Sequence, residues 1–315
     1  MTLAQRFRWF VYRLRARFSR APDNAPVVTV ENGAADKLTL AARVRARLHR
    51  YFRMAGGFVV TLLLLGAVGL YLLAVVSRVS FALSPVLETP EHSPRAMAAA
   101  EFLFRLPQAG VLDEQHLFAT PGLRRREAAA FEAAAEPARA YVALLRIRRG
   151  ARDPLIEEAR ESVQTEQSAP ADALDRLAAA ASRQQVVIDT SPQAFRTLAA
   201  EASASLAARA ADLAERARSS GVALEDDDAF HAARGEAYGW MVLLHAAAAD
   251  TDDAAVRDSP ALARAMTALA HAADYRPVLF VTGPRGGVFA PNHLSVVGLD
   301  IAIAAQEARE LATPR

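Results

Sequence analysis

Cysteine is absent from the 315 residues, and lysine is nearly absent. Without cysteine the chain can form no disulfide bond, no thiolate metal site and no cysteine nucleophile, although this does not fix its cellular compartment. Lys37 is the only lysine, so the other 36 of the 37 basic residues are arginine. Together with the excess of alanine, this bias indicates genome composition rather than function. Alanine buries little surface, so we expect helices that pack closely together.

Known catalytic patterns are also missing. The sequence has no H-E-x-x-H zinc motif, no G-x-S-x-G nucleophile elbow and no phosphate loop ending in Gly-Lys-Ser/Thr. Its histidines are scattered along the chain, and their spacing assembles no site. We therefore expect neither a cofactor nor a metal site. The sequence favours a protein that is not an enzyme, while leaving catalysis open.

Charge is distributed unevenly along the chain. Residues 1–55 hold twelve basic and three acidic residues, a net +9, while residues 56–315 hold the remaining 25 basic and 32 acidic residues, a net −7. Between Arg53 and Arg78 lie 24 residues without a charge, MAGGFVVTLLLLGAVGLYLLAVVS. A helix needs about 20 apolar residues to cross the hydrocarbon core of a bilayer. This stretch therefore predicts a single transmembrane helix over residues 56–76.

The flanking charges predict the orientation of this span. Five arginines between residues 43 and 53 precede it, in a predicted juxtamembrane basic helix over residues 37–55, whereas only Arg78 follows closely. The positive-inside rule places the N-terminus in the cytoplasm of a bacterium and residues 77–315 in the periplasm. A cleaved signal peptide is the alternative. Its apolar core is usually about 7–15 residues long and lies near the N-terminus, so we favour an uncleaved inner-membrane anchor.

Residues 1–36 read as a basic arm followed by a linker. Leu3, Phe7, Phe10, Leu14 and Phe18 are spaced by four, three, four and four residues, which predicts one apolar face of a helix. Such a helix lies on a leaflet of anionic lipid headgroups, although docking on a partner protein is the alternative. No reading motif accompanies the basic residues, so we expect no nucleic-acid binding. The residues assigned to the membrane surface are Arg6, Arg8, Trp9, Arg13, Arg15 and Arg17.

Residues 77–315 read as one helix after another. A proline in the first turn favours a helix start, and Pro94, Pro154, Pro192 and Pro260 each precede or open a helical pattern. We expect Pro107 to end one helix, and Pro137 to break or kink the helical region from about residue 122 to 149. Two apolar runs around TGPRGG, at 278–281 and 288–290, predict a short hairpin. The predicted fold is therefore mainly α, with a single transmembrane helix and a periplasmic multi-helix domain containing at most one small β-hairpin.

Two segments are candidates for a binding site. In Gly283–His293, Arg285 and the free amides at a helix start can hold an anion, but a structural turn with Asn292 as helix cap and His293 in the first turn explains the same residues. In Glu225–Asp228, Asp227 and Asp228 stand with other acids at a helix start. We interpret these acids as a cap and a solvated face rather than as metal ligands. If the two segments form one ligand site, they must meet in one pocket.

Two stretches resemble a known family. EDDDAFHAARGEAYGWMVLLHAAAAD, with its Ala-Arg-Gly run ending at Gly235 and the aromatic pair Tyr238 and Trp240, is one. RPVLFVTGPRGGVFAPNHLSVVGLDIAIAAQEARELA, with the loop Ala290–His293, is the other. Both are similar to the C-terminal half of the bacterial family called domain of unknown function 2333, with a weaker similarity around Thr120-Pro121-Gly122. The resemblance implies an N-terminal membrane span and an inner-membrane protein, and it supplies no catalytic residue.

These observations favour one function and leave an alternative. We expect a single-span inner-membrane protein whose periplasmic helical domain is a non-catalytic interaction or scaffold module of the cell envelope, with the lipid bilayer and an envelope protein as partners. The alternative is a ligand-binding sensor or hydrolase that uses the Gly283–His293 loop. A third hypothesis makes the basic arm the functional part. Gly235 and Gly239 predict close helix packing, with Trp240 in the core.

Overall fold

The structure is a computed structural model of the chain. It describes residues 49, 51, 56–69, 94–109, 121–149, 154–164, 170–218, 224–275 and 293–313. The chain divides into two compact units, residues 1–69 and residues 70–315. Several predictions fall outside the described residues, and they stay predictions: the arm and linker 1–36, most of the juxtamembrane helix 37–55, and the hairpin at 278–290. The individual residues concerned are Arg6, Arg8, Trp9, Arg13, Arg15, Arg17, Arg285 and Asn292.

The first unit contains the described part of the predicted span. Residues 56–69 form a helix, and its apolar side chains are exposed, Leu63 at 68% and Phe58 at 66%. Within the described part of the chain, no helix is both long and apolar enough to cross a membrane. Residues 70–76, which would complete the predicted span, lie outside the described residues. The transmembrane helix therefore stays a prediction.

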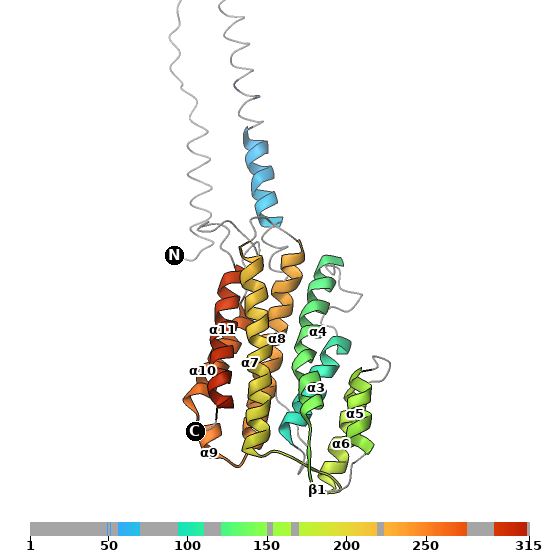
Figure 1. Cartoon of the computed structure of the whole chain (residues 1–315). Coiled ribbons are helices and arrows are strands. Elements are labelled where there is room, and N and C mark those ends of the chain that lie inside the picture. The colour runs from blue at the N-terminus through green and yellow to red at the C-terminus, as the bar shows by residue number, and fades with distance from the viewer. Residues whose placement is uncertain are drawn as a thin grey trace, which may run out of the picture. The chain divides into compact units, whose positions relative to one another are not determined.

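The second unit is a helical body, in which α8 lies between several of the other helices (Figure 1). Helix α8 packs against α3, α4, α7, α10 and α11, and the longest of these contacts is with α4. Helices α7 and α11 pack along each other, and α5 and α6 pack together beside α3 and α4. The elements are α3 (Arg95–Ala109), α4 (Pro121–Leu144), β1 (Ile147–Arg149), α5 (Pro154–Gln164), α6 (Pro170–Ser182), β2 (Val187–Ile188), α7 (Pro192–Arg216), α8 (Leu224–Asp250), α9 (Ala254–Arg257), α10 (Pro260–Asp274) and α11 (His293–Ala312).

Prolines open several of these helices, as predicted. Pro154, Pro192 and Pro260 are the first residues of α5, α7 and α10. Proline is suited to this position because its fixed φ matches the helix and its missing N–H would have no partner there. Ser191 completes the start of α7, since its side chain accepts a hydrogen bond from the backbone N–H of Ala194 at 3.3 Å.

The predicted helix end at Pro107 is wrong, because Pro107 lies inside α3, and α4 continues through Pro137 without the predicted break. A proline inside a helix costs about 3 kcal/mol or more through the lost hydrogen bond and the clash with the preceding turn. Helix α4 nevertheless continues through Pro137, because Ala134 and Ala138 on either side are fully buried against the rest of the core. In α3, Pro107 stands in the last turn, after the buried Leu103 and Phe104 have already fixed the helix.

Helices α4 and α8 approach closely at two glycines. A Cβ atom placed on Gly235 would lie 1.8 Å from the backbone oxygen of Ala130, and one on Gly239 would lie 2.3 Å from that of Ala134. No side chain fits at such distances, so both positions require glycine. Trp240, next to Gly239, is 1% exposed within the core. These findings confirm the predicted close packing and the buried tryptophan.

The described strands form one small antiparallel sheet, but not a hairpin. Strand β1 pairs with β2, with Ile147 opposite Ile188 and Arg149 opposite Val187, and two helices separate the strands along the chain. Sequence reasoning placed residues 147–149 in a helix, and this was wrong because α4 ends at Leu144. The described part of the body is therefore mainly helical with one two-stranded antiparallel sheet, which confirms the predicted mainly α class for this unit.

Candidate functional site

The predicted acidic cluster is partly buried and paired rather than solvated. Asp226, Asp227 and Asp228 lie in the first turn of α8. Asp227 forms an ion pair with Arg126, and Asp228 forms one of 2.5 Å with Arg125, both arginines coming from α4. The two aspartate side chains are 18% and 23% exposed. The prediction of a solvated face is corrected, because α4 brings two cations alongside the helix start.

His293 lies in the interior and contacts an aromatic group. It is the first residue of α11, and its Nδ1 lies 2.9 Å from the hydroxyl oxygen of Tyr275, at the end of α10. Burial lowers the pKa of His293. The ring of Tyr275 also packs edge-on against Phe230 of α8. Since Arg285 and Asn292 lie outside the described residues, the predicted meeting of this loop with the acids of α8 stays a prediction.

A buried arginine and histidine connect α8 to α10. Arg234 donates a hydrogen bond from Nε to the backbone oxygen of Ala273 at 2.9 Å, and its Nη1 lies 3.5 Å from Nδ1 of His231. Burial, followed by the charges of Arg234 and Arg126, lowers the pKa of His231 to about 3. His231 is therefore neutral near pH 7 and can accept a hydrogen bond from Arg234. The pair gives this part of the core a fixed polar contact between two helices.

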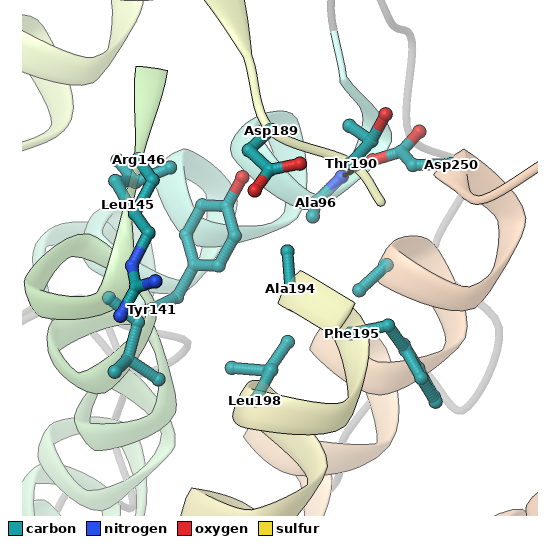
Figure 2. Close-up of a pocket in the computed structure, with 12 residues that line it drawn as sticks. Ala96, Tyr141, Leu145, Arg146, Asp189, Thr190, Ala194, Phe195, Leu198 and Asp250 are labelled. Carbon is teal, nitrogen blue, oxygen red and sulfur yellow. Dashed lines mark hydrogen bonds between the residues drawn. The ribbon is translucent and has the colours of Figure 1, made fainter. Parts of the chain in front are cut away.

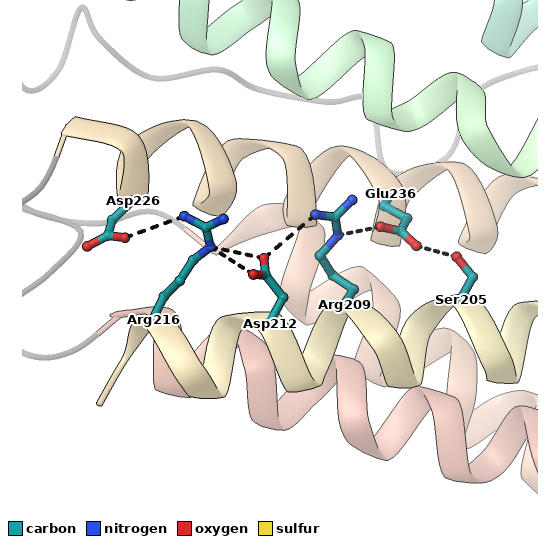
Figure 3. A network of polar contacts seen from close by, with 6 residues as sticks. All are labelled: Ser205, Arg209, Asp212, Arg216, Asp226 and Glu236. Atoms are coloured by element: carbon teal, nitrogen blue, oxygen red, sulfur yellow. Dashed lines mark hydrogen bonds and ion pairs between the residues drawn. The ribbon is translucent and has the colours of Figure 1, made fainter. Parts of the chain in front are cut away.

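A chain of charged side chains joins α7 to α8 (Figure 3). Arg209 donates to Glu236 at 2.6 Å, and Ser205 donates to the other oxygen of Glu236 at 2.5 Å. The chain continues along α7 through Asp212 and Arg216 to Asp226, the last contact being 3.9 Å. The Glu236 side chain is only 4% exposed, so its two partners compensate much of the cost of burying its charge. This arrangement fixes the register of two helices.

A pocket with polar and apolar sides lies where α4, α7 and α8 meet the small sheet (Figure 2). Its volume is about 40 Å³, enough for a few water molecules or the end of a side chain. Asp189 and Thr190 enter it from the turn between β2 and α7, and Tyr141 enters from α4. Figure 2 shows the phenol oxygen of Tyr141 directed toward the carboxylate of Asp189. The remaining lining residues are Ala96, Leu144, Leu145, Arg146, Ala194, Phe195, Leu198, Ala247 and Asp250.

Asp250 positions the start of α3 at the edge of this pocket. Its two carboxylate oxygens accept hydrogen bonds from the backbone N–H groups of Arg95 and Ala96, each at 2.8 Å. A helix start has free N–H groups and a positive dipole end, so a carboxylate there is stabilised. Burial raises the pKa of Asp250, although the two backbone hydrogen bonds oppose this shift. The residue thus fastens the last turn of α8 to the first turn of α3.

Sequence reasoning missed the pocket residues because they come from distant segments. Tyr141 belongs to α4, Asp250 to α8 and Asp189 to the turn between β2 and α7, and no spacing between them marks a site. The only local signal is Asp189-Thr190-Ser191 before Pro192. The backbone N–H of Ser191 donates to Asp189 at 3.0 Å there, a turn that the sequence indicates only as a helix start.

Comparisons with known proteins add no assignment: no family model, no curated protein and no solved structure matches the chain. The resemblance to the domain of unknown function 2333 family therefore stays a prediction.

Proposed function

We propose that the chain is a single-span protein of the bacterial inner membrane, with residues 77–315 in the periplasm, and that its helical body is a non-catalytic interaction or scaffold module. The uncharged 24-residue stretch and the arginines before it support the membrane placement. The outward-facing apolar side chains of helix 56–69 also support it, because lipid is a favourable environment for them.

The interaction role rests on one observation, a mainly apolar groove between α7 and α11 that the described residues leave open. The groove has a volume of about 360 Å³. Leu299 at 62% and Ile303 at 41% are exposed on neighbouring turns of α11 beside it, and among the described residues of the body only Val187 is a further large exposed hydrophobic. Apolar side chains gathered in this way are typical of a protein-binding surface. The groove is lined by Ala210, Ala214, Ala217, Arg218, Leu294, Ser295, Gly298, Leu299 and Ala302.

The shape and charge of the groove favour one occupant, an apolar helix of a partner protein that carries an acidic residue. Alanines at 210, 214 and 217 repeat at helical spacing, and their small side chains allow another helix to approach closely. Arg218 lines the same groove and forms no ion pair with a described residue. An acidic side chain on the incoming helix would complement this charge.

A photocrosslinker placed at Leu299 in living cells tests the interaction. We expect one dominant adduct, and the crosslinked peptide should be an apolar helical segment with an acidic residue. The same crosslinker at Arg176, exposed on α6, is the control and should not form this adduct. Adding Leu299→Asp to a chain with the crosslinker at Ile303 should abolish the adduct. A crosslink only to a second copy of this chain, or equal labelling from both α6 and α11, would refute the proposed partner.

Reporter fusions test the membrane placement separately. Alkaline phosphatase folds into an active enzyme only outside the cytoplasm, so we expect activity after Arg315 and none after Lys37. Fusions with the opposite pattern, or release of the untagged chain from membranes by alkaline carbonate, would contradict the single-span topology.

A further inference from the structure

The cationic end of the α7–α11 groove has a counterpart at the other end of the same two helices, which lie side by side (Figure 1). Arg218 stands just after the last turn of α7, and Arg196 lies near the start of this helix, about 30 Å away at about 1.5 Å per residue. Arg309 is exposed near the end of α11. The side chains of Arg196 and Arg309 form no ion pair with a described residue, so their charge is available to a partner.

The two helices run antiparallel, and this places the cations of α7 and α11 at shared ends. The hydroxyl group of Ser203 donates to the backbone oxygen of Ala305 at 2.8 Å. Further along α7, Leu213 lies against Gly298, where an added Cβ atom would be 3.4 Å from that of the leucine. Residue numbers therefore rise along α7 as they fall along α11. Arg309 consequently lies near the start of α7, so two cations mark this end of the helix pair and one marks the other.

The surface between the cations is small and apolar. Four alanines of α7 lie at spacings of seven, four and three residues, beginning four residues after Arg196 and ending four before Arg218, which puts them on one face. Three are exposed and one is half-buried: Ala200, Ala211 and Ala214, and Ala207. Leu299, 62% exposed, adds a large apolar side chain from α11. The exposed acids Glu201 and Glu215 fall outside this repeat, so the charge along it is positive and confined to its ends.

We propose that the partner of this groove is a helix of about 20 residues, apolar in the middle and with an acidic residue near each end, that lies along the full length of α7 and α11. The inference rests on the proposed function and adds the length of the partner helix and the spacing of its charges. A carboxylate near either end meets an arginine. A carboxylate in the middle would lose hydration against the alanines without gaining a cation, which is costly.

Photocrosslinkers at Ala214 and at Ala200, in separate chains in living cells, measure the length of the partner helix. Both residues are exposed, and they lie 14 residues apart on α7. We expect the same partner protein at both positions. The two attachment points should lie about 14 residues apart in one helical segment, because two helices packed along each other have the same rise per residue. A crosslinker at Arg176, exposed on α6, is the control and should not capture this protein.

Charge reversal tests the end of the groove near Arg196 and Arg309. The double variant Arg196→Glu, Arg309→Glu should lower the yield of the adduct at Ala200 by about fivefold or more, because one exposed ion pair contributes up to about fivefold and reversal adds repulsion. Exchanging the acidic residue of the partner that maps to this end for lysine should restore the adduct. Arg183→Glu reverses an exposed arginine after α6 and should leave the yield unchanged.

The outcomes separate this inference from the proposed function. Capture at Leu299 and Ala214 without capture at Ala200 would leave the proposed partner in place and overturn the long helix. Attachment points closer than about eight residues, about 12 Å of helix, would do the same, as would a yield that the double reversal leaves unchanged. Loss of capture at all three positions would overturn the proposed function as well. If circular dichroism shows that the double variant does not fold, the single change Arg196→Glu decides in its place.

Discussion

Replacing Gly235 with alanine should destabilise the body strongly. The added Cβ would lie 1.8 Å from the backbone oxygen of Ala130 and 2.7 Å from its carbonyl carbon. A carbon and a carbonyl oxygen need about 3.3 Å, so α4 and α8 must separate locally by about 1.5 Å. The obstacle is backbone rather than a flexible side chain, so neither helix can adapt by a change of rotamer.

The expected magnitude follows from two opposing effects. Overpacking a tight core costs about 1–3 kcal/mol and sometimes more, and separating one of the most extensive helix contacts in the body places this case at the upper end. Alanine regains about 1 kcal/mol of helix propensity over glycine. We expect a net loss of about 2 kcal/mol, which lowers the unfolding midpoint by about 4–8 °C for a domain of this size.

Gly298→Ala provides the matched control. The Cβ atom added to Gly298 in α11 would lie 3.4 Å from Cβ of Leu213, an ordinary contact, so this variant should be neutral or more stable by up to about 1 kcal/mol. Thermal unfolding of the full chain in detergent, followed by far-ultraviolet circular dichroism at one heating rate, compares the two. A midpoint for Gly235→Ala equal to or above that of the wild type, with helix content unchanged, would refute the close-packing argument.

Three further changes test other contacts. The folded pKa of His231, about 3, lies below its ordinary 6.5, so the unfolded chain binds a proton first and stability falls as pH drops from 6.5 toward 3. In denaturant titrations, His231→Gln should lack up to about 1.4 kcal/mol per pH unit of this loss. Substituting the exposed His245 should leave the loss unchanged. Glu236→Gln should lower the free energy of unfolding by about 3 kcal/mol, because Arg209 loses its buried partner. Glu136→Gln, at an exposed ion pair, is the control. A smaller loss for Glu236→Gln than for the control would contradict the stabilising role of the charged chain in Figure 3. Asp250→Ala should cost about 1–2 kcal/mol by uncapping α3, with faster amide exchange confined to its first turn; uniform exchange changes would argue against a local cap.

The helical organisation could be predicted from sequence where local chemistry decides the structure. Pro154, Pro192 and Pro260 open helices because a first-turn proline loses nothing there. The same residue type gave a wrong helix end at Pro107 and a break that is absent at Pro137, because burial of neighbouring side chains outweighs the backbone penalty. That balance depends on which helices meet, and a single sequence does not contain this information.

The sites were less predictable for the same reason. Asp227 and Asp228 were recognised as acids at a helix start, but their arginine partners lie about a hundred residues earlier, and no periodicity connects the two segments. The pocket is harder still, because Tyr141, Asp189 and Asp250 meet only after α4, α7 and α8 have packed. His231 was visible as a histidine, whereas its neutral state follows from burial and from Arg234 beside it.

The position of α5 and α6 at the margin of the body implies two levels of stability. These helices contact each other, α3 and α4, while the remaining long helices surround α8. Their amide protons should therefore exchange with deuterium through partial opening, ahead of those in α8. Strand β2 and Asp189 come after α6 in the chain, and the backbone N–H of Asp189 donates a hydrogen bond to the backbone oxygen of Arg146 at 2.9 Å. Partial opening of α5 and α6 would therefore open and re-form the pocket of Figure 2 while the central helices stay folded.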